Sequence, residues 1–244
     1  MGVIGTALIA GDPFQRIVVA GLARLFPSRR IAILTRWQRL FAHFILRTTR
    51  MLGGAHIQAP PRIPGEAGVL VLMNHQSVLD IPLVVSALPI HPRIVTRARY
   101  ARGKPLISHM IRLYQYPVVE PTATVRQHLK RVQESARDSP VPVVLYPEGM
   151  RTRDGRLGSW HEGALRVILG ARRWTVYIIV ADGFWQTALL TDFMKKVWSI
   201  DSRSAVVGPF VGPEPGADPD PFIADMRVRM EAALTGLRSE AMEG

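Results

Sequence analysis

A histidine and an aspartate, His75 and Asp80, stand five positions apart directly after the apolar segment 68–73. On a continuous helix this spacing would separate the two side chains by about 140°, so they would not meet. We therefore expect His75 to lie in a loop or at a helix entry, with Asp80 reaching back to it. An aspartate that keeps one imidazole nitrogen protonated leaves the other free to accept a proton from a substrate hydroxyl. The pair thus predicts a general base.

A single pair of this spacing has low specificity, because a histidine at a helix entry beside an unrelated aspartate also fits it. A second polar cluster, 146–153, follows another apolar segment, 140–145. Its Arg151 and Arg153 can bind phosphate oxygens through paired hydrogen bonds, and Glu148 can fix an arginine or a substrate hydroxyl. A charged surface turn without function is the alternative interpretation of one such loop. It explains less well why two strands of the same sheet are both followed by such a loop.

Strand-like and helix-like segments alternate through most of the chain, and this predicts an α/β fold. We expect a single mixed, largely parallel sheet flanked by helices, preceded by an N-terminal amphipathic helical segment. Ligands of such sheets bind where loops leave the carboxyl ends of strands, which is where both polar clusters fall. The expected strands are 68–73, 92–97, 116–120, 140–146, 174–181 and 204–210. The expected helices are 31–52, 81–88, 104–113, 122–137, 162–169 and 222–237.

Composition limits the possible functions. The chain has 244 residues, 48% of them hydrophobic, so it can bury a substantial core and is not disordered. It contains no cysteine, which excludes disulfides, thiolate metal sites and a cysteine nucleophile. Its net charge of +12 indicates an anionic partner, such as a phosphate-bearing substrate, a membrane surface or nucleic acid.

Most of the positive charge lies near the N-terminus, where nine arginines precede residue 63 and Asp12 is the only acidic residue. In the segment 31–52 an apolar face opposes a basic one, as in helices that lie at anionic lipid surfaces. An ordinary amphipathic helix packed on the core is the alternative. We expect 1–60 to be a membrane-associating segment and 61–244 the α/β domain. The apolar face comprises Trp37, Leu40, Phe41, Phe44 and Ile45, and the basic face Arg36, Arg39, His43, Arg47 and Arg50.

The two polar motifs resemble the signature of the glycerolipid acyltransferase family, the PlsC-like 1-acylglycerol-3-phosphate acyltransferases. The family pattern Asn-His-x4-Asp is matched by Asn74, His75 and Asp80. Its second pattern, Phe-Pro-Glu-Gly-Thr-Arg-Ser, is similar to Tyr-Pro-Glu-Gly-Met-Arg-Thr at 146–152. The similarity extends over residues 68–182.

This resemblance implies transfer of a fatty acyl group from acyl-CoA or acyl-carrier protein to a hydroxyl of a lyso-glycerolipid, with no further cofactor and no metal. His75 becomes the general base and Asp80 its orienting partner. The resemblance also implies a membrane lipid acceptor, an anionic membrane surface as partner, and a peripheral or monotopic location on the cytoplasmic face of the cell membrane. The implied acceptor-binding residues are Asn74, Glu148, Gly149, Arg151 and Arg153.

The chain departs from the family at the acceptor site. A family arginine that helps bind the acceptor phosphate ends a short strand between the two motifs, whereas the corresponding segment 116–120 ends in Glu120. Met150 replaces the usual threonine, and the segment 177–181 lacks the family's proline. Another lyso-lipid, or an amine- or sugar-bearing lipid, is therefore an alternative acceptor.

Other functions remain as alternatives. The same histidine and aspartate could hydrolyse an acyl thioester, with water in place of the acceptor. A serine hydrolase is disfavoured because the chain has no Gly-x-Ser-x-Gly elbow. A zinc hydrolase is disfavoured because His161-Glu162 lacks a second histidine. A non-catalytic protein that binds membranes through its basic N-terminus is a further alternative. Nucleic acid is not expected as a partner, since the basic face lacks an aromatic stacking platform.

Overall fold

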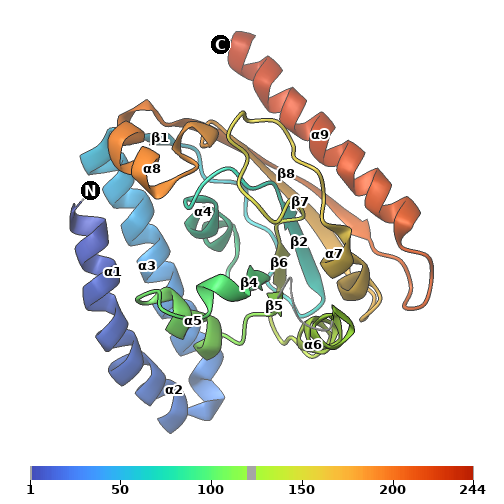
Figure 1. Ribbon diagram of the computed structural model, residues 1–244, viewed down its shortest axis with the longest axis horizontal. Coiled ribbons are helices and arrows are strands. Elements are labelled where there is room, and N and C mark those ends of the chain that lie inside the picture. The colour runs from blue at the N-terminus through green and yellow to red at the C-terminus, as the bar shows by residue number, and fades with distance from the viewer. Residues whose placement is uncertain (1, 120–124, 244) are drawn as a thin grey trace.

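A six-stranded sheet forms the centre of the molecule in a computed structural model that describes residues 2–119 and 125–243 (Figure 1). The strand order is β1-β8-β7-β2-β6-β3, and every neighbouring pair is parallel except β7 and β8. This confirms the expected mixed, largely parallel sheet. Its strands are β1 (His56–Ile57), β2 (Val69–Met73), β3 (Arg93–Ile94), β6 (Val143–Leu145), β7 (Thr175–Asp182) and β8 (Asp201–Val211).

Helices cover both faces of this sheet (Figure 1). The described helices are α1 (Gly2–Phe14), α2 (Ala20–Leu25), α3 (Arg30–Gly53), α4 (Asp80–Ala87), α5 (Ile107–Leu113), α6 (Val125–Arg137), α7 (Glu162–Leu169), α8 (Leu190–Lys196) and α9 (Asp220–Glu243). The segments expected to be helical, 81–88, 104–113, 162–169 and 222–237, correspond to α4, α5, α7 and α9.

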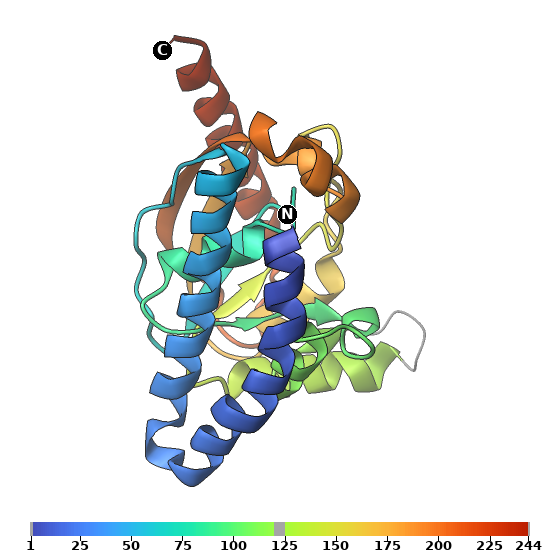
Figure 2. The same cartoon turned by 90° about the vertical axis from the view of Figure 1, so that its left-hand side faces the viewer.

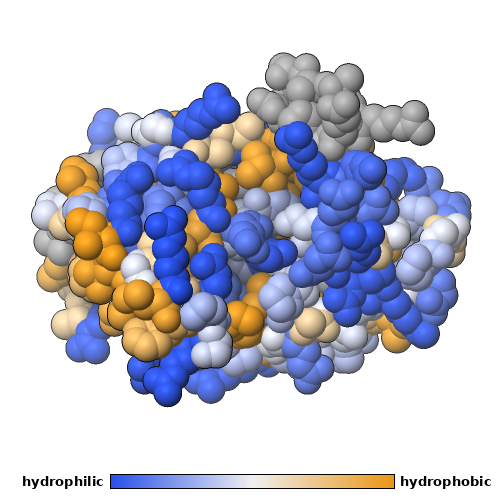
Figure 3. All heavy atoms as spheres, turned by 90° about the horizontal axis from the view of Figure 1, so that it is seen from below, coloured by the Kyte–Doolittle hydropathy of each residue, from blue (hydrophilic) through white to orange (hydrophobic). Residues whose placement is uncertain are grey.

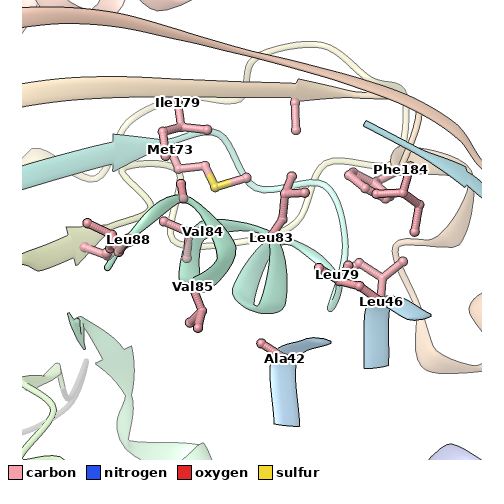
Figure 4. Close-up of a cluster of buried hydrophobic side chains, with 14 of the residues drawn as sticks. Ala42, Leu46, Met73, Leu79, Leu83, Val84, Val85, Leu88, Ile179 and Phe184 are labelled. Atoms are coloured by element: carbon pink, nitrogen blue, oxygen red, sulfur yellow. The ribbon is translucent and has the colours of Figure 1, made fainter. Parts of the chain in front are cut away.

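The central strands are buried on both faces because their side chains alternate between two apolar layers. In β2, Val71 and Met73 pack in the layer with α3, α4 and α8, while Leu70 and Leu72 pack in the layer with α6, α7 and α9. In the first layer, Met73 and Leu83 lie close together between β2 and α4 (Figure 4). This packing fixes the carboxyl end of β2 and the start of α4, and the loop 74–79 joins these two elements.

The N-terminal helices form a hairpin along one side of the sheet, with α1 and α3 side by side and α2 at the turn (Figure 2). A short π-helix, Gln15–Val19, joins α1 to α2. Among the described residues, no helix is long and apolar enough to cross a bilayer.

The buried face of α3 differs from the apolar face that the sequence suggested. Leu34, Ala42 and Leu46 face the protein interior, while Leu40 is 64% exposed and Phe44 is also exposed. The other three residues of the expected apolar face are partly buried. The helix itself is confirmed, but as an element that has both a core face and an exposed apolar face.

The prediction of one strand over 92–97 is wrong, because this segment forms two short strands in different sheets. β3 pairs with β6, and after Val95 the chain turns away so that Thr96 and Arg97 form β4 in a separate two-stranded sheet with β5 (Val118–Val119). The expected strand 116–120 is thus shorter, and Glu120 lies outside the described residues.

Candidate active site

The first polar loop leaves the carboxyl end of β2, and the side chain of Asn74 fixes it to the neighbouring strand. The Asn74 amide donates to the Ala181 carbonyl at 2.8 Å and accepts from the Ala181 N–H at 2.9 Å. Both hydrogen-bonding groups of this buried side chain are therefore used by β7. Asn74 was predicted to bind substrate, and the structure places it where it positions the residue that follows.

His75 and Asp80 meet as predicted, with 2.7 Å between His75 Nδ1 and Asp80 Oδ2. The same carboxylate oxygen accepts the backbone N–H groups of Gln76 and Ser77 at 2.6 and 2.8 Å. The Asp80 side chain is 0% exposed and that of His75 is 18% exposed. With Nδ1 bound to the carboxylate, Nε2 is the imidazole nitrogen left for a substrate, as a general base requires.

The imidazole of His75 is also held from one side by an aromatic ring. Tyr146, the residue after β6, stacks on it with ring centroids 4.4 Å apart and an interplanar angle of 29°. The tyrosine hydroxyl is buried and has no hydrogen-bond partner among the described residues. Burial, and after it the nearby Asp80 charge, raises the pKa of Tyr146 well above its ordinary value. Tyr146 therefore stays neutral and restricts the ring of His75 by contact.

Glu148 joins the second polar loop to the first. One carboxylate oxygen accepts the His75 backbone N–H at 2.9 Å, and the other accepts the Gly158 N–H at 2.8 Å. The Thr152 N–H in turn donates to the His75 carbonyl at 2.9 Å. The buried Glu148 was predicted to shape the acceptor site, and the structure places it where it holds the backbone of both loops.

The side chains of His161 and Arg97 pack against Gly149. Its φ of +61° lies in the left-handed region, and a Cβ there would be 3.1 Å from His161 Cδ2 and 3.2 Å from Arg97 Nη2. Only glycine combines this conformation with such close packing. Arg151 is half-buried, and its Nη1 is buried without a hydrogen-bond partner among the described residues. Arg153 is exposed.

Arg97 was missed by the sequence analysis. Arg97 ends β4 and pairs in parallel register with Val119 of β5, the strand that precedes Glu120 in the chain. Its guanidinium lies close to Gly149. The signal was present in the sequence, since an arginine ended the expected strand 92–97. Its significance depended on the separate pairing of β4 with β5, which no linear pattern revealed.

Within residues 2–119 and 125–243, no group of three or more histidine, aspartate or glutamate side chains is arranged to hold a metal ion. The first polar loop instead pairs His75 with a carboxylate, and Arg97 lies beside Gly149 of the second.

Glu148 predicts a specific pH dependence of stability. Burial raises the pKa of this carboxyl from 4.5 to about 7, and this effect outweighs the hydrogen bonds from two backbone N–H groups, which lower the pKa. Between these values the folded protein binds the proton more tightly than the unfolded chain, so this carboxyl lowers the free energy of unfolding as pH rises from about 4.5 to about 7. Glu148→Gln should remove this component, as measured by urea unfolding across that range. An identical pH profile in the variant would contradict the prediction.

Comparison with known proteins agrees with this geometry. The family described as Acyltransferase matches residues 54–181, which include both polar loops. No curated protein matches the chain. Among solved structures, the 1-acyl-sn-glycerophosphate (LPA) acyltransferase PlsC from Thermotoga maritima has a similar fold. Its TM-score is 0.72 at 17% identity, over 97% of this chain and 92% of that one. Because the family match covers more than half of its length, this chain belongs to the acyltransferase family.

Proposed function

We propose that this acyltransferase moves a fatty acyl group from acyl-CoA or acyl-carrier protein to a hydroxyl of a lyso-glycerolipid. The observation that supports this most strongly is the contact between His75 Nδ1 and the buried Asp80 carboxylate, which leaves Nε2 available to a hydroxyl. The printed description of the similar PlsC, a 1-acyl-sn-glycerophosphate acyltransferase, supports an acceptor of this class.

In the proposed reaction, His75 Nε2 removes the proton of the acceptor hydroxyl as its oxygen attacks the thioester carbonyl. The new carbon–oxygen bond gives a tetrahedral intermediate, which collapses with cleavage of the carbon–sulfur bond. The proton held by His75 then passes to the leaving thiolate, so the products are an ester and a thiol. Asp80 stabilises the imidazolium that forms between these two proton transfers.

Arg97 and Arg151 are proposed to bind the acceptor's phosphate. Arg97 reaches the backbone at Gly149, and the buried Nη1 of Arg151 has no partner among the described residues. A buried guanidinium N–H without a partner is costly unless a ligand accepts from it, and phosphate oxygens match the guanidinium geometry. Arg97 would thereby supply, from β4, the positive charge that Glu120 does not supply at the end of its own segment.

The N-terminal hairpin is proposed to hold the enzyme on the surface of a membrane, where lyso-lipid acceptors reside. Apolar side chains gather on the side that α1, α2 and α3 occupy, with strongly hydrophilic side chains between them (Figure 3). This pattern of exposed apolar groups beside arginines suits an anionic lipid surface. We place the protein on the cytoplasmic face of the cell membrane, as a peripheral or monotopic protein. The exposed apolar residues are Ile9, Phe14, Ile17, Val18, Leu22, Leu25, Phe26, Ile31, Leu40, Phe44, Met51 and Leu52.

His75→Ala should lower acyl transfer from a labelled thioester by at least about 100-fold, because a general base contributes roughly that much or more. The chain offers a matched control in His56→Ala. His56 Nδ1 lies 2.9 Å from Asp201, but those side chains are 79% and 72% exposed. Transfer within tenfold of wild type in a folded His75→Ala protein would refute the assignment. Release of free fatty acid at equal rates with and without acceptor would indicate a thioesterase instead.

Arg97→Ala should raise the KM for a lyso-lipid that carries a terminal phosphate monoester by at least about tenfold, since charge-assisted hydrogen bonds contribute about 1.5–3 kcal/mol. The measurement is a screen with one acyl thioester and a panel of lyso-lipids that differ in head group. Arg99→Ala, which removes an exposed arginine two residues away, serves as the control. An equal KM in both variants for every acceptor used would refute the role of Arg97.

Replacing three exposed residues of the hairpin, Ile17, Leu25 and Leu40, by glutamine should weaken binding to anionic lipid vesicles by at least about 100-fold. The reason is that a glutamine at these positions no longer buries an apolar side chain in the lipid. Binding by the wild type should also weaken with salt. Substitutions are preferable to deletion of the segment, since Ala42 and Leu46 belong to the core. Val228→Gln, at a position 65% exposed on α9, is the control. Equal vesicle binding by the triple variant and wild type would contradict the proposal.

A further inference from the structure

Arg238 lies on α9, outside the segment that matches the family, yet its guanidinium contacts the supports of both catalytic loops. Its Nε donates to Asp182 Oδ2 and its Nη2 to Asp182 Oδ1, each at 2.9 Å. The same Nη2 donates to the carbonyl of Gly155. One side chain therefore joins the end of β7 to the loop that follows Glu148.

The contact with Asp182 continues into the catalytic loop through Gln76. Gln76 Nε2 donates to Asp182 Oδ1 at 3.0 Å, and Gln76 Oε1 accepts the Phe184 N–H at 3.2 Å. Gln76 directly follows the proposed base, and its own N–H donates to Asp80. A continuous set of hydrogen bonds thus connects Arg238 with the residues that orient His75.

The contact with Gly155 fixes the second loop. Gly155 has φ of +76°, and a Cβ there would lie 3.0 Å from Arg238 Nη2 and 2.9 Å from Trp185 Cδ1. The loop therefore packs directly against the guanidinium at Gly155. In sequence this glycine lies between Glu148 and Gly158, and the Gly158 N–H donates to the Glu148 carboxylate. Movement of Gly155 would be transmitted to the group that holds the His75 backbone.

Arg238 is itself held in a defined position. Leu234 and Leu237, on the same part of α9, are buried, and the arginine is half-buried. Although burial raises the pKa of Asp182, the hydrogen bonds from Arg238 and Gln76 lower it overall. Asp182 is therefore a carboxylate near neutral pH, and the arginine faces a full opposite charge.

We propose that Arg238 is a positioning residue of the acyl-transfer site, which holds the His75 loop and the loop 149–158 at a fixed separation. This inference rests on the proposed role of His75. The forked guanidinium is suited to the task because it donates to two carboxylate oxygens and to a carbonyl at once. The ammonium of a lysine, a compact charge on a flexible stem, would not reproduce this geometry.

Arg238→Ala should lower kcat by at least about tenfold while the KM for the acyl thioester changes by less than about threefold, since small displacements of reacting groups slow chemistry strongly. Arg238→Lys should recover little of the lost rate. Arg229→Ala is the matched control, because Arg229 lies on the same helix and pairs with Asp225 of that helix at 2.8 Å. A kcat for Arg238→Ala within twofold of this control would overturn the proposal. If the alanine variant does not fold, the same comparison is made with the lysine variant.

Two further measurements separate positioning from a general loss of stability. The N–H groups of Gln76, Ser77 and Gly158 donate to the carboxylates of Asp80 and Glu148. In Arg238→Ala, hydrogen exchange at these three groups should accelerate more than exchange in the rest of the sheet. The effects of Arg238→Ala and Asp182→Asn on kcat should also be non-additive. Uniform acceleration across the sheet, or additive effects, would overturn the proposal. The exchange result does not depend on activity, so it remains decisive even if the wild type proves not to transfer acyl groups to lyso-lipids.

Discussion

The candidate site depends on one buried charge, the carboxylate of Asp80. A carboxylate without exposure to water is unfavourable unless hydrogen bonds replace its hydration. Its Oδ2 accepts from the ring of His75 and from two successive backbone N–H groups, whereas its buried Oδ1 has no hydrogen-bond partner among the described residues. Those bonds also determine the shape of the loop, because the chain must curve round the carboxylate to present three donors to it. Stabilisation of the charge and orientation of the imidazole are consequently the same interaction.

The remaining residues of the two motifs act largely through the backbone. Asn74 pairs with Ala181, and Glu148 accepts from His75 and Gly158. Beyond the carboxyl ends of β2 and β6, where hydrogen bonds between strands stop, these polar side chains bind the backbone instead. They therefore hold the two loops in defined positions. Arg151, in contrast, has a buried guanidinium N–H without a partner among the described residues.

Much of the fold could be predicted from sequence because apolar segments and breakers identify buried strands and the helices between them. The meeting of His75 with Asp80 was also predictable, since a spacing of five excludes a shared helix face. The pairing of β4 with β5 was not predictable, and with it the position of Arg97, because registers between short strands depend on tertiary contacts. The periodicity of α3 also did not show which side chains face the core, since Leu34 and Leu46 are buried while Leu40 is exposed. The supporting role of Asn74 likewise depends on a strand more than a hundred residues away.

The hydrogen bonds that hold the candidate site together join residues far apart in sequence. They span 73 residues between His75 and Glu148, 107 between Asn74 and Ala181, and 56 between Asp182 and Arg238. Closing such long loops costs chain entropy before any contact is gained, which slows the formation of structures rich in distant contacts. The local hairpin of α1 to α3 can form early, whereas the site needs β2, β6, β7 and α9 to be in place together. Catalytic competence should therefore be among the last properties that this chain acquires as it folds.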